Sequence, residues 1–320
     1  MEKRSKREFT INVLSLIIIG SALLLTFAPD FSLISNLAYY TLHFMFAFLL
    51  LGMTFLFFSQ RRLMFASLIS CGLLCVFLKK ASNQHIVLPD SNNLPSLDIA
   101  HFNLSNIQEN RDSLFKMLKR LDPDVISFQE FTPDWNNYFE SNKLYKYDYF
   151  SKEVRIDPYG MCILSKYPIK NANLYYHKDI PNYKSNLVMD DLSIAMYTSY
   201  LLPPFSPSGK VDTRAHLQQI VHEVNDSDLP SIVLGDFNMV YWEKDISDFR
   251  SNAKLSNSRR DIDVKSLKIP YDHIFYSEEL ECTSFVELFD GGDNHIGIYG
   301  QFQVKSEDIL ENSISPKNLF

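Results

Sequence analysis

The chain of 320 residues has little cysteine, little glycine and no excess of basic residues. Four cysteines are too few for the disulfide framework of a small secreted scaffold. With 10 glycines, 14 prolines and 46% hydrophobic residues, the chain is neither collagen-like, low-complexity nor disordered. The formal charge of −7 argues against a protein that coats DNA phosphates. The mean hydropathy of −0.11 suits a soluble protein, but the apolar residues are unevenly placed.

Three apolar runs without Asp, Glu, Lys or Arg occupy the first 80 residues. They cover residues 11–28, 37–58 and 63–78, which are 18, 22 and 16 residues long. A membrane-spanning helix needs about 17–25 apolar residues, so the first two runs suffice and the third is short unless flanking basic residues extend it. None has a polar face, which disfavours core helices of a soluble domain. We therefore expect a three-span membrane anchor over residues 1–80, with two spans and an interfacial segment as the alternative.

The basic residues around these runs predict an orientation. Four of them lie between residues 3 and 7, and Arg61 and Arg62 separate the second run from the third, whereas residues 29–36 contain none. By the positive-inside rule the N-terminus is cytoplasmic, and three spans then place the following domain outside the cytoplasmic (inner) membrane. A cleaved signal peptide is the alternative for the first run, but two more apolar runs follow at once. We expect a retained, multi-pass anchor.

The rest of the chain predicts one α/β domain. Residues 81–96 form a polar linker with two prolines, residues 97–305 are long enough for one large core, and residues 306–320 form a polar tail. Helical spacing of apolar residues occurs at 114–121 and 217–224. Short β-type runs recur at residues 97–102, 125–128, 161–164, 193–200, 231–234, 272–276, 283–288 and 296–304. The excess of strands favours two packed, mainly antiparallel sheets flanked by helices over a doubly wound parallel sheet.

Polar residues gather at the ends of these strands, where a sandwich brings them to one rim. The clusters are His101 with Asn103, Gln129 with Glu130, residues 235–238, Asp272, and residues 293–295. A Gly-Asp-x-Asn turn alone is a weak signal, because these are ordinary turn residues. Turn chemistry does not call for Glu or His, so five such clusters together indicate a catalytic site.

Seven motifs lie at these places. They are HFNLSN (101–106), DPDVISFQEFTPDW (122–135), GMCILSKYPI (160–169), TSYLLPP (198–204), IVLGDFNM (232–239), PYDHIFYS (270–277) and GDNHIGIYGQF (292–302). Together they resemble the motifs of the endonuclease/exonuclease/phosphatase superfamily. Their order and spacing match over nearly the whole polar domain. The leading apolar segment also resembles a bacterial subgroup in which this domain is tethered to the membrane.

The resemblance implies a four-layered α/β sandwich and a phosphoesterase that depends on a divalent cation. It implies that Glu130 is the principal Mg²⁺ ligand and that Asn103 supports the metal side. Mg²⁺ is a hard ion that prefers oxygen and accepts one or two carboxylates, with waters and substrate phosphate completing its shell. Mn²⁺ is the alternative ion.

The resemblance also implies roles in the hydrolysis of a phosphodiester or phosphomonoester by water. Asp236 would orient or deprotonate the water, and Asn238 would hydrogen-bond a phosphoryl oxygen. Asp272 would hold His295 in one tautomer and stabilise its charged form. His295 would then serve as a base or as a cationic donor to the developing negative charge.

Two positions depart from the commonest pattern of the family. Many members carry His where this chain has Tyr200, but a phenol can donate to a phosphate oxygen or protonate a leaving group. Asn294 replaces the usual metal-side Asp, so it brings an amide oxygen without negative charge. Asp293 is adjacent, although strand alternation turns its side chain elsewhere. The alternative function is therefore a binding or scaffold module that keeps the fold with impaired catalysis.

Charge bears on the substrate. Residues 81–320 hold 23 Lys and Arg against 35 Asp and Glu, a formal charge of −12. Nucleases that grip duplex DNA usually present a basic stripe, and no basic run comparable to a DNA-binding arm occurs here. The composition favours a phosphate ester that is small or lies at the bilayer surface over duplex DNA, although a local cleft potential can oppose net charge.

A few further residues are expected to be structural. Cys162 and Cys282 lie in apolar strands and are expected to be two separate buried thiols rather than a disulfide. His273 is expected on the face of its strand opposite Asp272 and partly exposed, and His216 and His222 on the surface of a helix.

Overall fold

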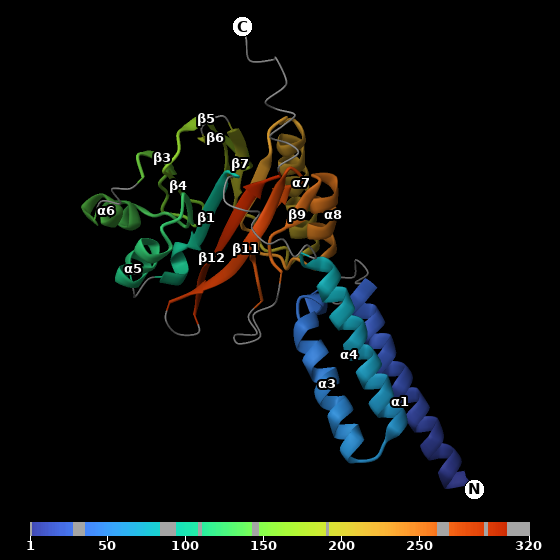
Figure 1. The fold of residues 1–320 in the computed structure, drawn as a ribbon. Helices are drawn as coiled ribbons and strands as arrows, with labels where there is room; N and C mark the ends of the chain where they lie inside the picture. Colours follow the sequence, from blue (N-terminus) through green and yellow to red (C-terminus); the bar gives the residue numbers. More distant parts are fainter. Residues whose placement is uncertain are drawn as a thin grey trace.

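The computed structural model shows a two-sheet sandwich with three apolar helices extending from its lower side (Figure 1). It describes residues 2–27, 36–83, 94–107, 111–142, 147–189, 192–260, 269–290 and 294–305. The predicted tail 306–320, Asp293 and most of the predicted linker lie outside the described residues.

Each sheet has six strands and one parallel pair. The first has the order β11 (Leu280–Phe289), β12 (His295–Val304), β1 (Ser96–Asn103), β2 (Val125–Gln129), β4 (Met161–Ser165) and β3 (Tyr149–Glu153). The second has the order β5 (Ile169–His177), β6 (Ile180–Met189), β7 (Leu192–Ser199), β8 (Ser231–Asp236), β10 (Asp272–Ser277) and β9 (Leu255–Asn257). Only β1 with β2 and β7 with β8 are parallel among the described pairs, so the sheets are mainly antiparallel as predicted.

Helices cover the outer face of each sheet and make the fold four-layered. Those on the first sheet are η1 (Leu104–Ile107), α5 (Arg111–Leu121) and α6 (Pro133–Asn142), and those on the second are α7 (Pro207–Asn225) and α8 (Lys244–Asn252). At the start of α7, Ser206 Oγ accepts a hydrogen bond from Gly209 N at 3.0 Å and Pro207 occupies the first helical turn.

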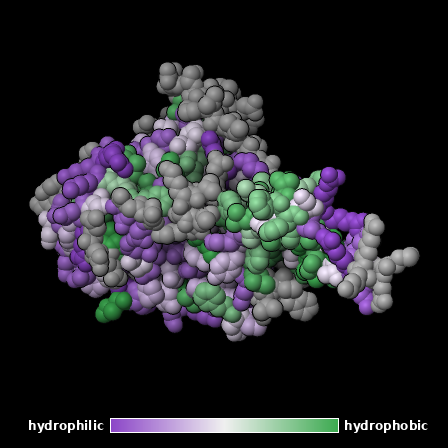
Figure 2. Space-filling model, turned by 90° about the horizontal axis from the view of Figure 1, so that it is seen from below, coloured by the Kyte–Doolittle hydropathy of each residue, from purple (hydrophilic) through white to green (hydrophobic). Residues whose placement is uncertain are grey.

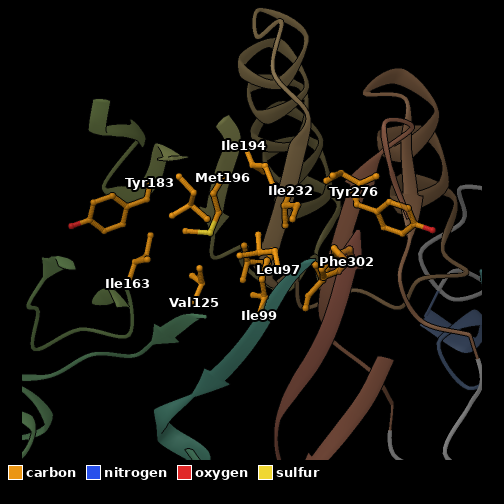
Figure 3. Packing of buried hydrophobic residues seen from close by; sticks show 14 of the residues in the cluster. Leu97, Ile99, Val125, Ile163, Tyr183, Ile194, Met196, Ile232, Tyr276 and Phe302 are labelled. Atoms are coloured by element: carbon orange, nitrogen blue, oxygen red, sulfur yellow. The ribbon is translucent and has the colours of Figure 1, made fainter. Parts of the chain in front are cut away.

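Side-chain alternation along the strands fills the space between the sheets. Leu97 and Ile99 of β1 meet Ile232 and Leu234 of β8 there, within one apolar cluster (Figure 3). Ala100 and Phe102, which follow in the alternate register of β1, face the helices instead. A period of two with both faces apolar is what a strand buried on both sides requires.

The apolar N-terminal segment forms the helices α1 (Glu2–Phe27), α3 (Thr41–Phe57) and α4 (Arg61–Ala81). Of these, Ser5–Phe27 and Arg61–Ala81 are long and apolar enough to cross a membrane. The second expected span contains a helix of 17 residues, and the third lies within a helix of 21 residues. The basic pairs at both ends of α4 are part of the helix and extend it beyond the apolar run of 16 residues.

The N-terminal apolar helices, with the residues next to them, share an apolar cluster with the sandwich. Tyr39, Leu42 and Leu78 pack with Val240 and Trp242, which lie in the loop after β8. The indole Nε1 of Trp242 donates to the backbone oxygen of Ala38 at 2.8 Å, and Arg250 Nη1 donates to that of Ala81 at 2.9 Å. The first residues of the predicted linker therefore lie against the domain.

Cys162 and Cys282 are free, buried thiols, as predicted. Two histidine predictions were wrong. His273 does face away from Asp272, but it is 1% exposed because Phe237 and the loop after β8 cover that side of the sheet. His216 is 2% exposed, since its ring stacks on that of His177 at 4.4 Å. His222 is exposed as expected.

Candidate active site

The ends of five strands meet at one rim of the sandwich. The parallel strands β1 and β2 end side by side at Asn103 and Gln129, and β12, antiparallel to β1, begins there at His295. In the second sheet Asp236 ends β8 opposite Asp272, the first residue of antiparallel β10. By strand alternation, Asn103, Gln129, Asp236 and Asp272 lie on the face that carries the core between the sheets. His295 reaches the same face, because its neighbour Ile296 packs in the outer cluster beneath the helices and its own ring contacts Asp272. The rim thus brings together the residues that the strand-end pattern singles out.

The side chain of Asn103 joins two carboxylates. Its Nδ2 donates to Glu130 Oε1 at 3.0 Å and to Asp236 Oδ2 at 3.2 Å, while its Oδ1 accepts from Ser105 N at 3.0 Å. Ser105 Oγ donates to the same Glu130 oxygen at 3.1 Å. Glu130 follows a strand of the first sheet and Asp236 ends a strand of the second, so Asn103 holds the two together across the sandwich.

The side chain of Gln129 links the same two sheets by hydrogen bonds to backbone atoms of the second sheet. The sequence alone does not reveal this role. Its Oε1 accepts from Asp236 N at 2.8 Å, and its Nε2 donates to Ser199 O at 2.7 Å. Gly235 lies against this amide with φ of +148°, and a Cβ there would lie 1.9 Å from Ser199 O. The glycine of the Gly-Asp-x-Asn turn is therefore needed for the fit of the two sheets.

Asn238 and Tyr200 lie beside the carboxylates. Asn238 has a φ of +51°, which asparagine tolerates, and its backbone N donates to Asp236 Oδ1 at 2.9 Å while its Nδ2 donates to Leu201 O at 2.8 Å. Burial, followed by the charges of Asp236 and Glu130, raises the pKa of the Tyr200 phenol. Tyr200 therefore stays protonated and can donate a hydrogen bond.

His295 and Asp272 form a hydrogen-bonded pair, with 2.8 Å between His295 Nε2 and Asp272 Oδ2. Burial of Asp272 opposes its ionisation, but the hydrogen bond to His295 and then the charge of that imidazole outweigh burial and hold the pKa of the carboxyl below its ordinary value. Asp236 behaves in the opposite way. Burial, and then the charges of Asp272 and Glu130, raise the pKa of Asp236 to about 7.

Buried ionisable residues behind the pair were not anticipated from the sequence. Arg259 is 1% exposed, forms an ion pair with Glu287, and donates from Nη2 to the backbone oxygen of Asp272 at 3.3 Å. Glu287 Oε2 lies 3.9 Å from His295 Nδ1, so carboxylates flank both ring nitrogens. His101 Nε2 lies 3.9 Å from Asp272 Oδ1, and burial lowers the pKa of His101 to about 4, which keeps it neutral.

Asn294 lies beside His295 at the mouth of the rim. It is exposed, and its Nδ2 donates to the backbone oxygen of Asn106 at 3.1 Å. The two asparagines, Tyr271, Glu287 and His295 line an open cavity of about 310 Å³. The cavity is large enough for a phosphate ester, and its walls offer hydrogen-bond donors, the His295 ring and the Glu287 carboxylate.

The rim offers oxygen donors for a divalent cation, but few charged ones. Within the described ranges, no group of three or more His, Cys, Asp and Glu could hold a metal ion. Glu130, assisted by waters and a substrate phosphate, nevertheless fits Mg²⁺, which accepts one or two carboxylates. Asn103 turns its nitrogen to Glu130 and its oxygen to Ser105, so here it orients the carboxylate.

Residues 100–295 match the model of the Endonuclease/Exonuclease/phosphatase family. Solved structures with this fold include D. rerio TDP2 complexed with single strand DNA product, at 14% identity, TM-score 0.53, and coverage of 65% of this chain and 99% of that one. The human nocturnin catalytic domain with bound sulfate anion has 14% identity, TM-score 0.53, and coverage of 67% and 97%. The Bacteroides thetaiotaomicron mannosyl-6-phosphatase has 16% identity, TM-score 0.52, and coverage of 64% and 99%. Such low identities establish the fold alone. No curated protein sequence matches the chain.

Proposed function

The chain belongs to the endonuclease/exonuclease/phosphatase family, and from this premise we propose that it is a membrane-anchored phosphoesterase that depends on a divalent metal ion. One observation carries the proposal. The amide of Asn103 bridges Glu130 and Asp236, and Asp236 pairs across the ladder with Asp272, which holds His295. Two carboxylates, a carboxylate–imidazole pair and neutral donors therefore face one point on the rim, which suits hydrolysis of a phosphate ester.

Each residue of the site has its own role in hydrolysis. Asp236 orients the attacking water and accepts its proton, and its position is fixed by Asn103 and by the Gln129 bond to its backbone. His295, held by Asp272, donates to the phosphoryl group as negative charge grows on its oxygens. Tyr200 and Asn238 are the neutral donors on the other side. Mg²⁺ on Glu130 would supply further positive charge next to the phosphate, with Asn103 supporting Glu130.

The anchor supports an extracytoplasmic position for this domain. Helices α1 and α4 pack together, and Arg62 Nη1 donates to Asn12 Oδ1 at 3.0 Å near the end remote from the sandwich. Lys6, Arg7 and Arg61 lie at the same end, as a cytoplasmic location of basic residues requires. Protease protection in right-side-out vesicles tests this: the domain should be cleaved without lysis, and cleavage only after lysis contradicts the orientation.

The test of catalysis uses the full chain in detergent micelles with a generic aryl phosphodiester. Mg²⁺ should support turnover and EDTA should abolish it, and Glu130→Ala and His295→Ala should each lower kcat by about 10²–10⁴-fold. His222→Ala is the matched control, because His222 is an exposed histidine of α7 and should leave kcat unchanged. Full activity in the His295→Ala protein contradicts the mechanism.

Asn294 favours one second candidate, a binding or scaffold module that keeps the fold with impaired catalysis. Its amide lacks the charge of the family's usual Asp at this position, and Mg²⁺ binding weakens accordingly. If the module is impaired, Mg²⁺ and Mn²⁺ leave the melting temperature of the native chain unchanged, and Asn294→Asp produces a large gain in turnover. A small effect of Asn294→Asp on an already active enzyme rejects this candidate.

The charge of the domain guides the choice of substrate class. The similar structures include a TDP2 bound to a DNA product and a mannosyl-6-phosphatase, so they span nucleic acid and sugar phosphate. A formal charge of −12 over residues 81–320 opposes the approach of a long polyanion. We therefore favour a small phosphate ester or one at the bilayer surface over duplex DNA.

A further inference from the structure

The contact between anchor and sandwich lies on the same rim as the candidate active site. The loop that packs on Tyr39 and Leu42 starts at Met239, the residue after Asn238. On the other side of that loop, the ring of Tyr271, next to Asp272, lies 6.5 Å from the ring of Tyr39. Both attachment points are adjacent in sequence to residues of the candidate site.

One segment of the sandwich both contacts the anchor cluster and lines the cavity. Ile269 and Tyr271 pack against the apolar cluster that contains the anchor residues, and the same segment lines the 310 Å³ cavity together with His295 and Glu287. A bilayer around the anchor helices therefore comes within one side-chain layer of the cavity.

The length of α4 indicates where the surface of that bilayer lies along the helices. Its 21 residues extend about 31 Å at 1.5 Å per residue, which equals the thickness of the hydrocarbon core. Its last residue, Ala81, accepts a hydrogen bond from Arg250 of the domain, and Asn83 N donates to Arg259 O at 2.7 Å. The hydrocarbon boundary therefore falls where the helices meet the sandwich, at the rim of the site.

The side chains at the junction of the helices with the sandwich are of the kind expected at a membrane surface. Tyr39, Tyr40, Trp242 and Tyr271 gather at the domain ends of the helices, and amphipathic aromatics of this kind mark membrane–water interfaces. Seen from below, hydrophobic residues collect over the helices while the neighbouring face of the sandwich is largely hydrophilic (Figure 2). Apolar helices and a polar rim side by side are what an enzyme at a bilayer surface requires.

We propose that the cavity opens at the surface of the bilayer that holds the anchor and that the substrate is a membrane lipid whose phosphate ester lies in that leaflet. This inference rests on the proposed phosphoesterase function. In the reaction a water oxygen bonds to phosphorus, one P–O ester bond of the lipid breaks, and a proton from the water goes to the departing alcohol. Confinement of enzyme and lipid to one surface raises their effective concentration.

The decisive experiment reconstitutes the full chain in vesicles of phosphatidylethanolamine and phosphatidylglycerol at a 3:1 ratio with Mg²⁺. Loss of each lipid is followed by mass spectrometry beside two soluble arms, the corresponding glycerophosphodiesters without acyl chains and an aryl phosphodiester. Lipid should be hydrolysed at least about tenfold faster than its deacylated counterpart. Turnover of either soluble diester with the lipids intact overturns the inference but leaves the proposed function standing. If the aryl diester is also untouched, the proposed function fails and the inference fails with it.

A fluorescence measurement tests the bilayer level without activity. The chain has two tryptophans, so Trp135→Phe leaves only Trp242 at the junction, and Trp242→Phe leaves only Trp135 in α6 as the matched control. In nitroxide-labelled bilayers Trp242 should be quenched more by a label at the head group than by one at acyl carbon 12, and Trp135 by neither. Equal quenching of the two tryptophans, or stronger quenching of Trp242 by the deep label, overturns the inference.

Discussion

At the level of single residues, the site is supported by a chain of buried charges that runs away from the rim. Arg259 neutralises Glu287 and caps the backbone oxygen of Asp272, and Glu287 in turn faces His295. Burial lowers the pKa of Arg259 to about 10, yet it remains charged at neutral pH. A buried pair of this kind stabilises the fold only while both partners are present.

Removing one partner of the Arg259–Glu287 ion pair should lower the free energy of unfolding more than removing both. Arg259→Met leaves Glu287 without its buried partner and should lower the free energy of unfolding by about 3–5 kcal/mol. The double variant Arg259→Met with Glu287→Met should recover a large part of that loss, measured by denaturant unfolding of the full chain in detergent. Lys152→Met, which breaks an exposed pair with Glu140, is the control and should cost at most about 1 kcal/mol. Additive losses in the double variant would contradict this account.

Glu243, at the start of α8, makes stability depend on pH. Burial, followed by the charge of Asp245, raises the pKa of Glu243 to about 7, although the Tyr39 hydroxyl and the charges of Lys210 and Arg214 act in the opposite direction. The folded state binds the proton of Glu243 more tightly than the unfolded state does. Protonated Glu243 therefore adds to the free energy of unfolding below pH 4.5, and this stabilisation is lost as the pH rises through 7. The loss is about 3 kcal/mol at most.

Glu243→Gln should therefore raise the melting temperature at pH 8 by several degrees and leave it unchanged at pH 4.5. Glu140→Gln is the control with the opposite sign, because the hydrogen bond from Lys152 lowers the pKa of that exposed carboxyl. A gain for Glu243→Gln that is larger at pH 4.5 than at pH 8 would disprove the assignment.

At the level of elements, the site depends on how closely β2 and β8 approach. The amide of Gln129 fills the space between the strand ends, and Gly235 is the position where that space is tightest. Asp236 comes directly after this contact, so its carboxylate is placed by the packing of the two sheets rather than by its own turn.

Gly235→Ala should disrupt this contact. The new Cβ would overlap Ser199 O and lie 2.8 Å from Gln129 Nε2, so the sheets must separate and a residue with φ of +148° is strained as well. We expect a fall in melting temperature of about 10 °C or more and a loss of turnover of at least about 10²-fold. Gly72→Ala, in α4 with nothing within 4 Å of the added Cβ, should change neither quantity. Normal turnover in Gly235→Ala would show that the fit of the sheets does not place Asp236.

The strands that the sequence predicts are those with an apolar face toward the core. All eight predicted strands are confirmed. Most of them are buried on both sides, which imposes continuous apolar runs such as residues 231–234, whereas β11 is a partly exposed edge strand. The unpredicted strands β3, β5 and β9 are short or largely exposed edges, and β6 alternates with Asn182 and Ser185 at buried positions. A pattern based on apolar residues misses strands whose inward residues are polar.

The same limit applies to the candidate site. Asn103, Glu130, Asp236, Asp272 and His295 were singled out because each stands at the end of a recognisable strand, and they do come together. Arg259 and Glu287 were missed, and Gln129 was singled out without its role. The importance of all three comes from partners 13 to 107 residues away that only the sheet register brings close. Local sequence contains no signal of such contacts.

At the level of the whole molecule, the N-terminal apolar helices pack directly against the sandwich rather than being joined to it by the linker alone. Removal of residues 1–83 would expose Val240, Trp242 and Tyr271 and leave the Trp242 indole without its acceptor. The fragment 84–320 should therefore melt at a lower temperature than the full chain in detergent and self-associate on size-exclusion chromatography. A fragment that stays monomeric with an unchanged melting temperature would mean that the junction contributes nothing to the fold.

Substituting two leucines of α4 one at a time distinguishes a weaker contact with the sandwich from weaker packing among the N-terminal helices. Leu78 is buried in the cluster shared with the domain, whereas Leu74 is buried among the anchor helices. Either change to Ala removes comparable apolar area and costs about 2–5 kcal/mol where it acts. Leu78→Ala should lower the melting temperature of the sandwich, followed by near-ultraviolet circular dichroism, and Leu74→Ala should not. Because the loop that Leu78 supports starts next to Asn238, Leu78→Ala should also reduce turnover of a phosphodiester more than Leu74→Ala. Equal effects would place the coupling in the helices alone.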